Sequence, residues 1–78
     1  MVNYDRSAYQ AALSDFTKVI KEYPEFGRGY LQRGATYAQL RDYDKAIADV
    51  EKALALELSA ADRTEAEQML EEFKAARQ

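Results

Sequence analysis

The sequence predicts an all-α protein of about four helices, and three observations lead to that prediction. Residues recur at a spacing of 34, a period typical of repeats built from helical hairpins, so that Tyr9 returns as Tyr43 and Asp15 as Asp49. Apolar residues follow steps of three and four, as they do along one face of a helix. No segment shows the apolar–polar alternation that is typical of a strand.

A first helix is expected over residues 4–23. Asn3 or Asp5 is suited to cap its start, because a short side-chain oxygen accepts a hydrogen bond from the free N–H groups there. Pro24 ends the helix, because the residue before a proline disfavours the helical conformation. The apolar stripe of this helix comprises Tyr9, Ala12, Leu13, Phe16, Val19, Ile20 and Tyr23.

A second helix is expected over residues 26–40, with Tyr30, Gly34 and Tyr37 on one face. Its beginning is weak, because each glycine in a helix interior costs about 1 kcal/mol relative to alanine. Gly34 should instead allow the next helix to approach closely, since small residues pack against large ones across a helix interface.

The third helix is expected to begin at Asp42, a favourable N-cap. A fourth helix is expected over residues 62–77, where Asp62 and Glu65 have the spacing of a capping box. The loops between the helices are short, so consecutive helices should be antiparallel neighbours in a single domain over residues 1–78. The residues expected to point inward are Ala46, Ile47, Val50, Ala53 and Leu54 in the third helix and Ala66, Met69, Leu70, Phe73 and Ala76 in the fourth.

The composition argues against an enzyme. The 78 residues include no cysteine and no histidine, which removes thiolate and imidazole metal ligands and the commonest general base. The carboxylates of the fourth helix, such as Glu71 and Glu72, are interpreted as a solvated charged face. We therefore expect no catalytic residue, no metal and no cofactor.

Charge and hydropathy also narrow the partners. The formal net charge of −3 argues against a nucleic-acid partner, which would favour a basic surface. The apolar runs are far shorter than the roughly 20 residues that cross a bilayer, so no membrane partner is expected. The first residues show no secretion signal, and a cytoplasmic location is the expectation.

The repeated residues resemble the tetratricopeptide repeat. Tyr30, Gly34 and Tyr37 occupy the aromatic, glycine and tyrosine places of that repeat's first helix. Ala46 and Val50 have the spacing of the alanine–aromatic pair in its second helix. The resemblance implies antiparallel helical hairpins with right-handed superhelical stacking.

An earlier, incomplete copy of the repeat precedes this one. Ala12 and Phe16 match the same pair, and Pro24 stands at the closing proline. The resemblance therefore implies one and a half repeats followed by a C-terminal capping helix. The implied divisions are the second helix of a partial repeat over 4–23, a full repeat over 27–60 and the capping helix over 62–77.

Four residues depart from the family pattern. Arg33 stands at the leucine place and Val50 at the aromatic place of the second helix. Leu58 stands at the closing proline, and Arg41 at the glycine that usually ends the first helix. If Arg41 adopts the left-handed conformation that suits glycine, the cost is roughly 1 kcal/mol.

The resemblance implies that the first helix of the full repeat lines a concave binding face. The residues placed on that face are Arg28, Leu31, Gln32, Ala35, Ala38 and Gln39. Leu31 and Ala35 stand where some family members carry the residues that grip a terminal carboxylate, so that clamp is broken here.

Charge gives a clue to the ligand. Residues 26–41 contain three arginines and no acid, about +3 in a chain of net −3. Such a surface would steer acidic or phosphorylated peptides toward it. The alternative is structural, with Arg41 complementing the helix C-terminus and Arg33 packing its aliphatic stem.

The first helix lacks the hairpin partner that a complete repeat would supply. Part of its stripe at Tyr9, Leu13, Phe16 and Ile20 is expected to stay exposed, which would favour self-association, a docked partner or further repeats. Alternatively, residues 1–7 lengthen the first helix and the fourth helix folds back over it in a self-contained monomer.

The sequence thus predicts a protein–protein interaction module, a scaffold without catalysis that binds a peptide or a partner protein. The alternative is a minimal or engineered helical-repeat unit whose main property is folding or self-association as a homodimer through the first helix.

Overall fold

The computed structural model describes residues 6–77. These residues form four helices, α1 (Arg6–Glu22), α2 (Gly27–Gln39), α3 (Tyr43–Ala55) and α4 (Ala60–Arg77), and no strand. The predicted all-α class is therefore confirmed. The predicted first-helix start at residue 4, with its caps Asn3 and Asp5, lies outside the described residues.

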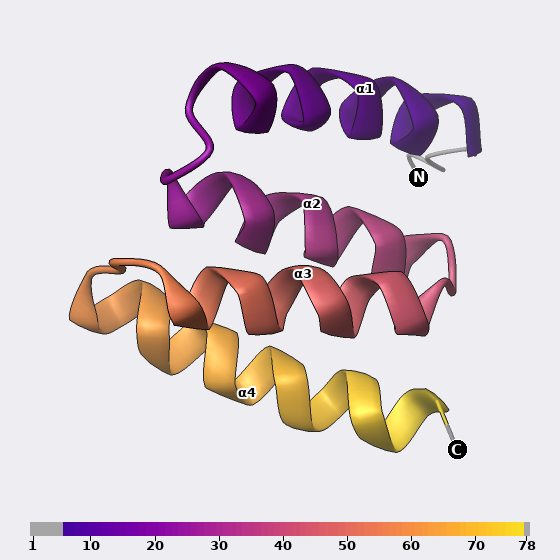
Figure 1. The fold of residues 1–78 in the computed structure, drawn as a ribbon. Helices are drawn as coiled ribbons and strands as arrows, with labels where there is room; N and C mark the ends of the chain where they lie inside the picture. The colour runs from indigo at the N-terminus through magenta and orange to yellow at the C-terminus, as the bar shows by residue number, and fades with distance from the viewer. Residues whose placement is uncertain (1–5, 78) are drawn as a thin grey trace.

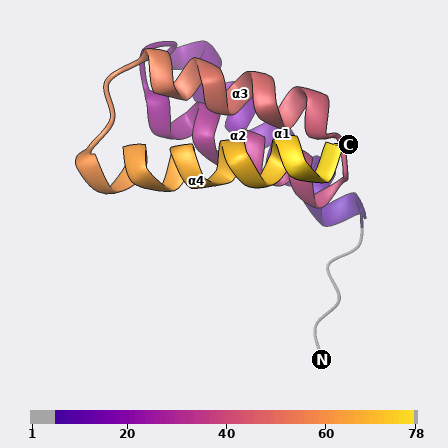
Figure 2. The same ribbon diagram turned by 90° about the horizontal axis from the view of Figure 1, so that it is seen from below.

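The helices lie side by side in chain order, each antiparallel to the one before it (Figure 1). α2 packs between α1 and α3, while α4 packs against α3 and also reaches α2. Seen from below, α4 lies nearest the viewer and α1 lies behind (Figure 2). Within residues 6–77, α1 packs against α2 alone, so the alternative in which the fourth helix folds back over the first is wrong.

The core is small and is built where α2, α3 and α4 meet. Leu31, Val50, Ala53 and Ala66 form its buried centre. Larger side chains pack around these residues, namely Tyr30, Leu54, Leu58, Met69, Leu70 and Phe73. Alanines against aromatic and branched side chains let the helices interlock with few voids.

Gly34 sets the distance between α2 and α3. A Cβ atom at this position would lie 3.1 Å from both the carbonyl oxygen of Ala46 and Cγ2 of Val50. Contacts that short would push the two helices apart. The prediction that Gly34 allows the next helix to approach closely is confirmed.

The helix ends agree with the prediction in α3 and differ in α4. Asp42 caps α3, its Oδ1 accepting a hydrogen bond from the Lys45 N–H at 3.3 Å. The expected start of the fourth helix at Asp62 is wrong, because α4 begins at Ala60 and the Oγ of Ser59 accepts from the Asp62 N–H at 3.1 Å. Ser59 is an equally good cap and lies nearer the end of α3, so the loop is shorter than expected.

Arg41 ends α2 in the left-handed conformation, with φ of 63°. Its N–H donates to the carbonyl of Ala38 at 3.0 Å and so satisfies one of the last carbonyls of the helix. The chain then turns at once into the Asp42 cap of α3.

Candidate functional site

The predicted binding face of α2 is the face on which α4 packs. Leu31 lies on this face and is only 3% exposed, in contact with the core residues Val50, Ala53 and Ala66. Leu31 is therefore a core residue rather than a ligand contact. The reason is α4, which covers the face where Leu31 lies.

The part of α2 that α4 covers is bordered by Arg28, Gln32 and Ala35. Arg28 Nη1 donates to Asp62 Oδ1 of α4 at 2.7 Å, and the Arg28 side chain remains 49% exposed. With Gln32 and Ala35 it borders a hollow of about 70 Å³ between α2 and α4, which also includes Glu65 and Met69. That volume is room for about two water molecules, so no peptide side chain enters here in this arrangement.

Ala38 and Gln39 border a larger hollow at the other end of the same interface, about 430 Å³ in volume. We call it the α2–α4 hollow. Volumes of this size are common for small-ligand sites. Its lining residues are Ala38, Gln39, Arg41, Tyr43, Glu72, Phe73 and Ala76.

Two aromatic rings give the α2–α4 hollow an apolar wall. The rings of Tyr43 and Phe73 lie with centroids 6.3 Å apart and planes tilted by 43°. Gln39 is held at the edge, since the Tyr9 hydroxyl of α1 donates to its Oε1 at 3.4 Å. Tyr43 and Phe73 were not predicted as site residues, because periodicity shows that such residues face inward but not which side of the core they reach.

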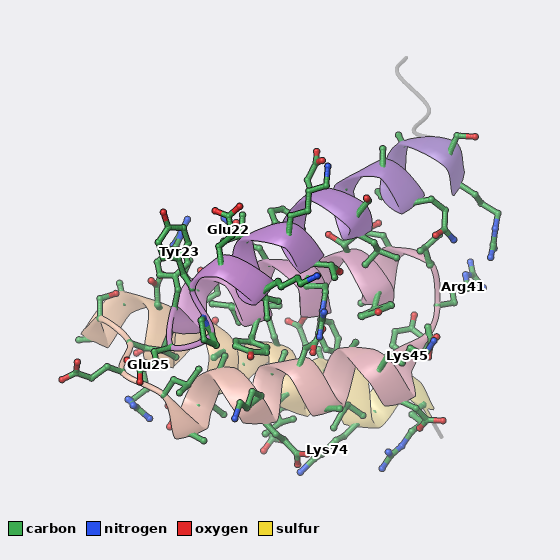
Figure 3. All side chains as sticks on the ribbon, turned by 45° about the horizontal axis from the view of Figure 1, so that its top comes forward. Glu22, Tyr23, Glu25, Arg41, Lys45 and Lys74 are labelled. Carbon is green, nitrogen blue, oxygen red and sulfur yellow. The ribbon has the colours of Figure 1, made fainter. Side chains whose placement is uncertain are left out.

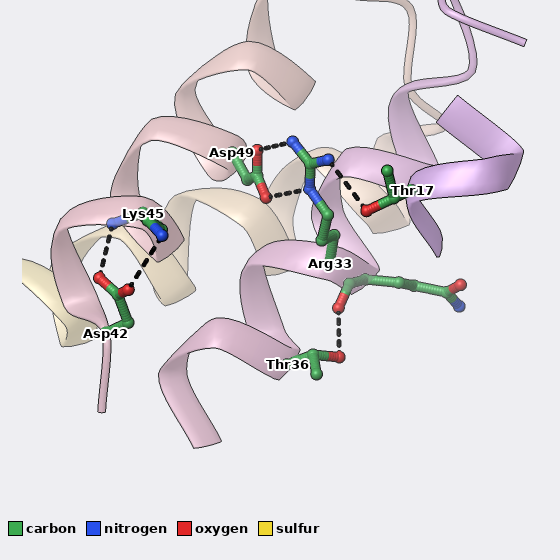
Figure 4. A network of polar contacts seen from close by, with 7 residues as sticks. Thr17, Arg33, Thr36, Asp42, Lys45 and Asp49 are labelled. Carbon is green, nitrogen blue, oxygen red and sulfur yellow. Dashed lines mark hydrogen bonds and ion pairs between the residues drawn. The ribbon is translucent and has the colours of Figure 1, made fainter. Parts of the chain in front are cut away.

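Arg33 joins three helices. Its Nε and Nη2 groups donate to the two carboxylate oxygens of Asp49 in α3, at 2.7 and 2.8 Å, and Nη1 donates to Thr17 Oγ1 in α1 at 3.4 Å (Figure 4). The guanidinium carbon lies 5.8 Å from the ring centroids of both Tyr30 and Tyr37. The hydrogen bond to Asp49 is the main cause that raises the pKa of Arg33, so the side chain stays charged.

The pair of Arg33 with Asp49 was not predicted from the sequence. Asp49 is 6% exposed. In the sequence it lies among Ala46, Val50 and Ala53, which are predicted to point inward, so it is an acid on an apolar helix face. A buried carboxylate requires a cation, and that was the available signal. The structure thus gives Arg33 a neutralising partner and places its guanidinium on the side of α2 that faces α1 and α3.

The apolar stripe of α1 is mostly covered by α2. Ile20 is 9% exposed and lies against Gly29, where an added Cβ would meet its Cγ1 at 3.4 Å. Ile20 is therefore buried rather than available for self-association, because glycine in α2 lets it approach. Tyr9, Leu13 and Phe16 are half-buried.

Two further observations concern metals and membranes. Among residues 6–77, no group of three or more acidic, histidine or cysteine side chains is arranged to hold a metal ion. None of the helices described is both long and apolar enough to span a membrane.

Comparison with known proteins identifies the class. The family model for the tetratricopeptide repeat matches residues 27–57, which comprise α2 and α3. Residues 27–57 of this chain are a tetratricopeptide repeat, and the resemblance noted in the sequence is confirmed there.

A similar protein is the small glutamine-rich tetratricopeptide repeat-containing protein 2 of Saccharomyces cerevisiae, which is 34% identical over 59 residues. The matched segment is 76% of this chain but only 16% of that protein. No solved structure matches the chain significantly.

Proposed function

We propose that this chain is a non-catalytic protein-interaction module that binds a peptide or a partner protein at the α2–α4 hollow. The observation that carries the proposal is the hollow itself, about 430 Å³, beside Ala38 and Gln39 of the predicted binding face. Its aromatic wall suits an apolar side chain of a ligand, since aromatic rings contribute large contact areas. The tetratricopeptide repeat over residues 27–57 supports a role in protein–protein interaction.

The proposed contact set is smaller than the predicted face. Its members on α2 are Ala38 and Gln39, and the aromatic residues Tyr43 and Phe73 of the same hollow are added to them. Arg28, Gln32 and Ala35 border only the small hollow, and Arg28 is already paired with Asp62. Arg41 and Glu72 carry opposite charges at the rim of the α2–α4 hollow, so its local charge does not favour an acidic ligand over a neutral one.

The test is a peptide selection followed by a blocking substitution. Peptides would be selected from a random library on the wild-type chain, and their dissociation constants measured by fluorescence polarisation. Ala38→Trp fills part of the hollow and should weaken the selected peptides at least about tenfold, a loss of about 1.4 kcal/mol. Ala48→Trp adds the same side chain to an exposed position of α3 and serves as the control.

Equal binding by the wild type and both variants would contradict the proposed site. Failure to select any peptide would contradict the proposed function itself. Circular dichroism of both variants establishes that the helices are intact before the affinities are compared.

Self-association is the second candidate function. It is favoured by the packing of α1, which touches α2 alone among residues 6–77, whereas α2 and α3 each pack against two or more helices. Tyr9, Leu13 and Phe16 are half-buried on α1, and a second copy would cover them further.

A further inference from the structure

A trough runs between α1 and α3, on a different face of the molecule from the α2–α4 hollow. Both helices pack on α2 and not on each other, so α2 forms the floor between them (Figure 3). Two hollows of about 500 and 400 Å³ make up the trough, and they share Gln10, Leu13 and Tyr37. We call this surface the α1–α3 trough.

The α1–α3 trough is strongly basic. Five cationic residues line it, and the single acidic residue among the lining side chains is Asp42, so the lining carries about +4 in a chain of net −3. Arg41 and Lys45 lie at its end near the α2–α3 loop (Figure 3). The five cationic residues are Arg6, Lys18, Lys21, Arg41 and Lys45.

Acidic neighbours do little to neutralise these cations. Within residues 6–77, Lys18, Lys21 and Arg41 form no ion pair, and Lys45 is 3.8 Å from Asp42, which already caps α3. The exposure of Lys18, Lys21 and Arg41 leaves their charges directed to solvent and available to an anion.

The floor of the trough concentrates positive charge further. The Tyr37 ring has Lys45 Nζ at 5.6 Å from its centroid and the Arg33 guanidinium carbon at 5.8 Å. An aromatic face attracts cations, so this ring holds them beside the trough. Asp49 neutralises Arg33, but no acidic side chain performs that role for Lys18 or Lys21 within the described residues.

The trough also contains apolar surface. Leu13 and Leu40 lie along the lining with the Tyr37 ring between the basic residues. A peptide with acidic and apolar side chains satisfies both features, whereas a polyphosphate backbone satisfies only the charge. The rest of the chain is acidic, which disfavours large polyanions such as nucleic acids or anionic membranes.

We propose that the α1–α3 trough binds an acidic segment of a partner protein that carries apolar side chains. This interaction goes beyond the proposed function, since the trough and the α2–α4 hollow are different surfaces that share only Arg41 among their lining residues. The expected preference for acidic peptides therefore belongs to the trough rather than to the predicted concave face.

The length of the trough sets the length of the probe. Arg6 and Lys21 are about 22 Å apart along α1, at 1.5 Å per residue. An extended peptide rises about 3.3 Å per residue, so about seven residues follow the trough from end to end. A fluorescein-labelled peptide of about eight residues, alternating glutamate with leucine, is the probe.

The wild-type chain should bind this probe, and added salt should weaken binding because screening grows with ionic strength. Lys18→Glu combined with Lys45→Glu should weaken binding about tenfold or more, since two attractive charges become repulsive. The Ala38→Trp variant should bind the probe as the wild type does, which separates this proposal from the function proposed for the α2–α4 hollow.

The matched control is Lys74→Glu combined with Arg77→Glu on α4. This variant changes the net charge by the same amount and also loses one exposed ion pair, Arg77 with Asp44 at 3.3 Å, but lies outside the trough lining. It should retain most of the affinity. When the probe is titrated into the wild-type chain, the largest amide chemical-shift changes in NMR spectra should occur at Leu13, Lys18 and Tyr37.

Four results would overturn the proposal. The first is no binding of the probe by the wild-type chain at low salt, and the second is an equal loss of affinity in the trough variant (Lys18→Glu with Lys45→Glu) and the control variant. The third is wild-type affinity in the trough variant, and the fourth is a set of amide chemical-shift changes that lies outside the trough. Two competing ligands are tested in the same way, a single-stranded oligothymidylate and phosphatidylserine vesicles. If either binds more tightly than the probe and loses the same affinity in the trough variant, the trough is assigned to a nucleic acid or a membrane instead.

Discussion

The ion pair between Arg33 and Asp49 is the polar contact whose loss should most affect stability. Replacing Arg33 by methionine keeps an apolar stem between Tyr30 and Tyr37 but removes both hydrogen bonds to the carboxylate. Asp49 is then a buried charge without its cation, with a side chain only 9% exposed.

The expected cost follows from the burial of the two partners. Breaking a fully buried pair by removing one member costs about 3–5 kcal/mol. The Arg33 side chain is 20% exposed, so water can reach the site and reduce the penalty, and we expect about 2–3 kcal/mol. A domain of this size has a total stability of about 4–12 kcal/mol, so the loss is a large fraction of the whole.

Urea unfolding followed by circular dichroism measures this cost as a shift in the midpoint at constant slope. Arg77→Met is the control, because it breaks an exposed pair with Asp44 and should cost at most about 0.5 kcal/mol. The double variant Arg33→Met with Asp49→Leu should be more stable than Arg33→Met alone, since it leaves no charge unpaired. The buried pair is not a major source of stability if Arg33→Met costs as little as the control. The same conclusion follows if the effects of Arg33→Met and Asp49→Leu simply add in the double variant.

Two further predictions concern packing and assembly. Gly29→Ala should stabilise the chain by up to about 1 kcal/mol, because its Cβ finds contacts of ordinary length and alanine favours the helix. Gly34→Ala should destabilise the chain by about 1 kcal/mol net, because overpacking against Ala46 and Val50 outweighs the gain in helix propensity. Thermal unfolding midpoints that shift in the same direction for Gly29→Ala and Gly34→Ala would contradict these two predictions. Under the self-association alternative, light scattering during size-exclusion chromatography should show a wild-type dimer that Phe16→Glu converts to a monomer. A wild-type monomer at every concentration removes that alternative.

Much of the fold was predictable because its determinants are local. The spacing of apolar residues placed the helices, and Asp42 capped α3 as its side chain predicted. The resemblance placed Gly34 at the glycine position of the repeat, and the packing of small residues against large ones predicted the close contact there.

The candidate site was less predictable because it depends on contacts between distant segments. Leu31 and Ala38 lie on the same face of α2, yet α4 buries the first and leaves the second beside a hollow. Ser59 and Asp62 were both able to cap a helix, and the position of α4 decided which one did.

The all-α class and the tetratricopeptide repeat over residues 27–57 are legible in the sequence alone, because helix periodicity, caps and a repeat period are all patterns along the chain. Which charges remain free depends instead on how the helices pack. Arg28 and Arg33 find acids on α4 and α3, whereas Lys18 stays unpaired within the described residues beside the trough. The physical reason is that a charge is neutralised by whatever lies within a few ångströms of it, and packing brings those neighbours from other helices.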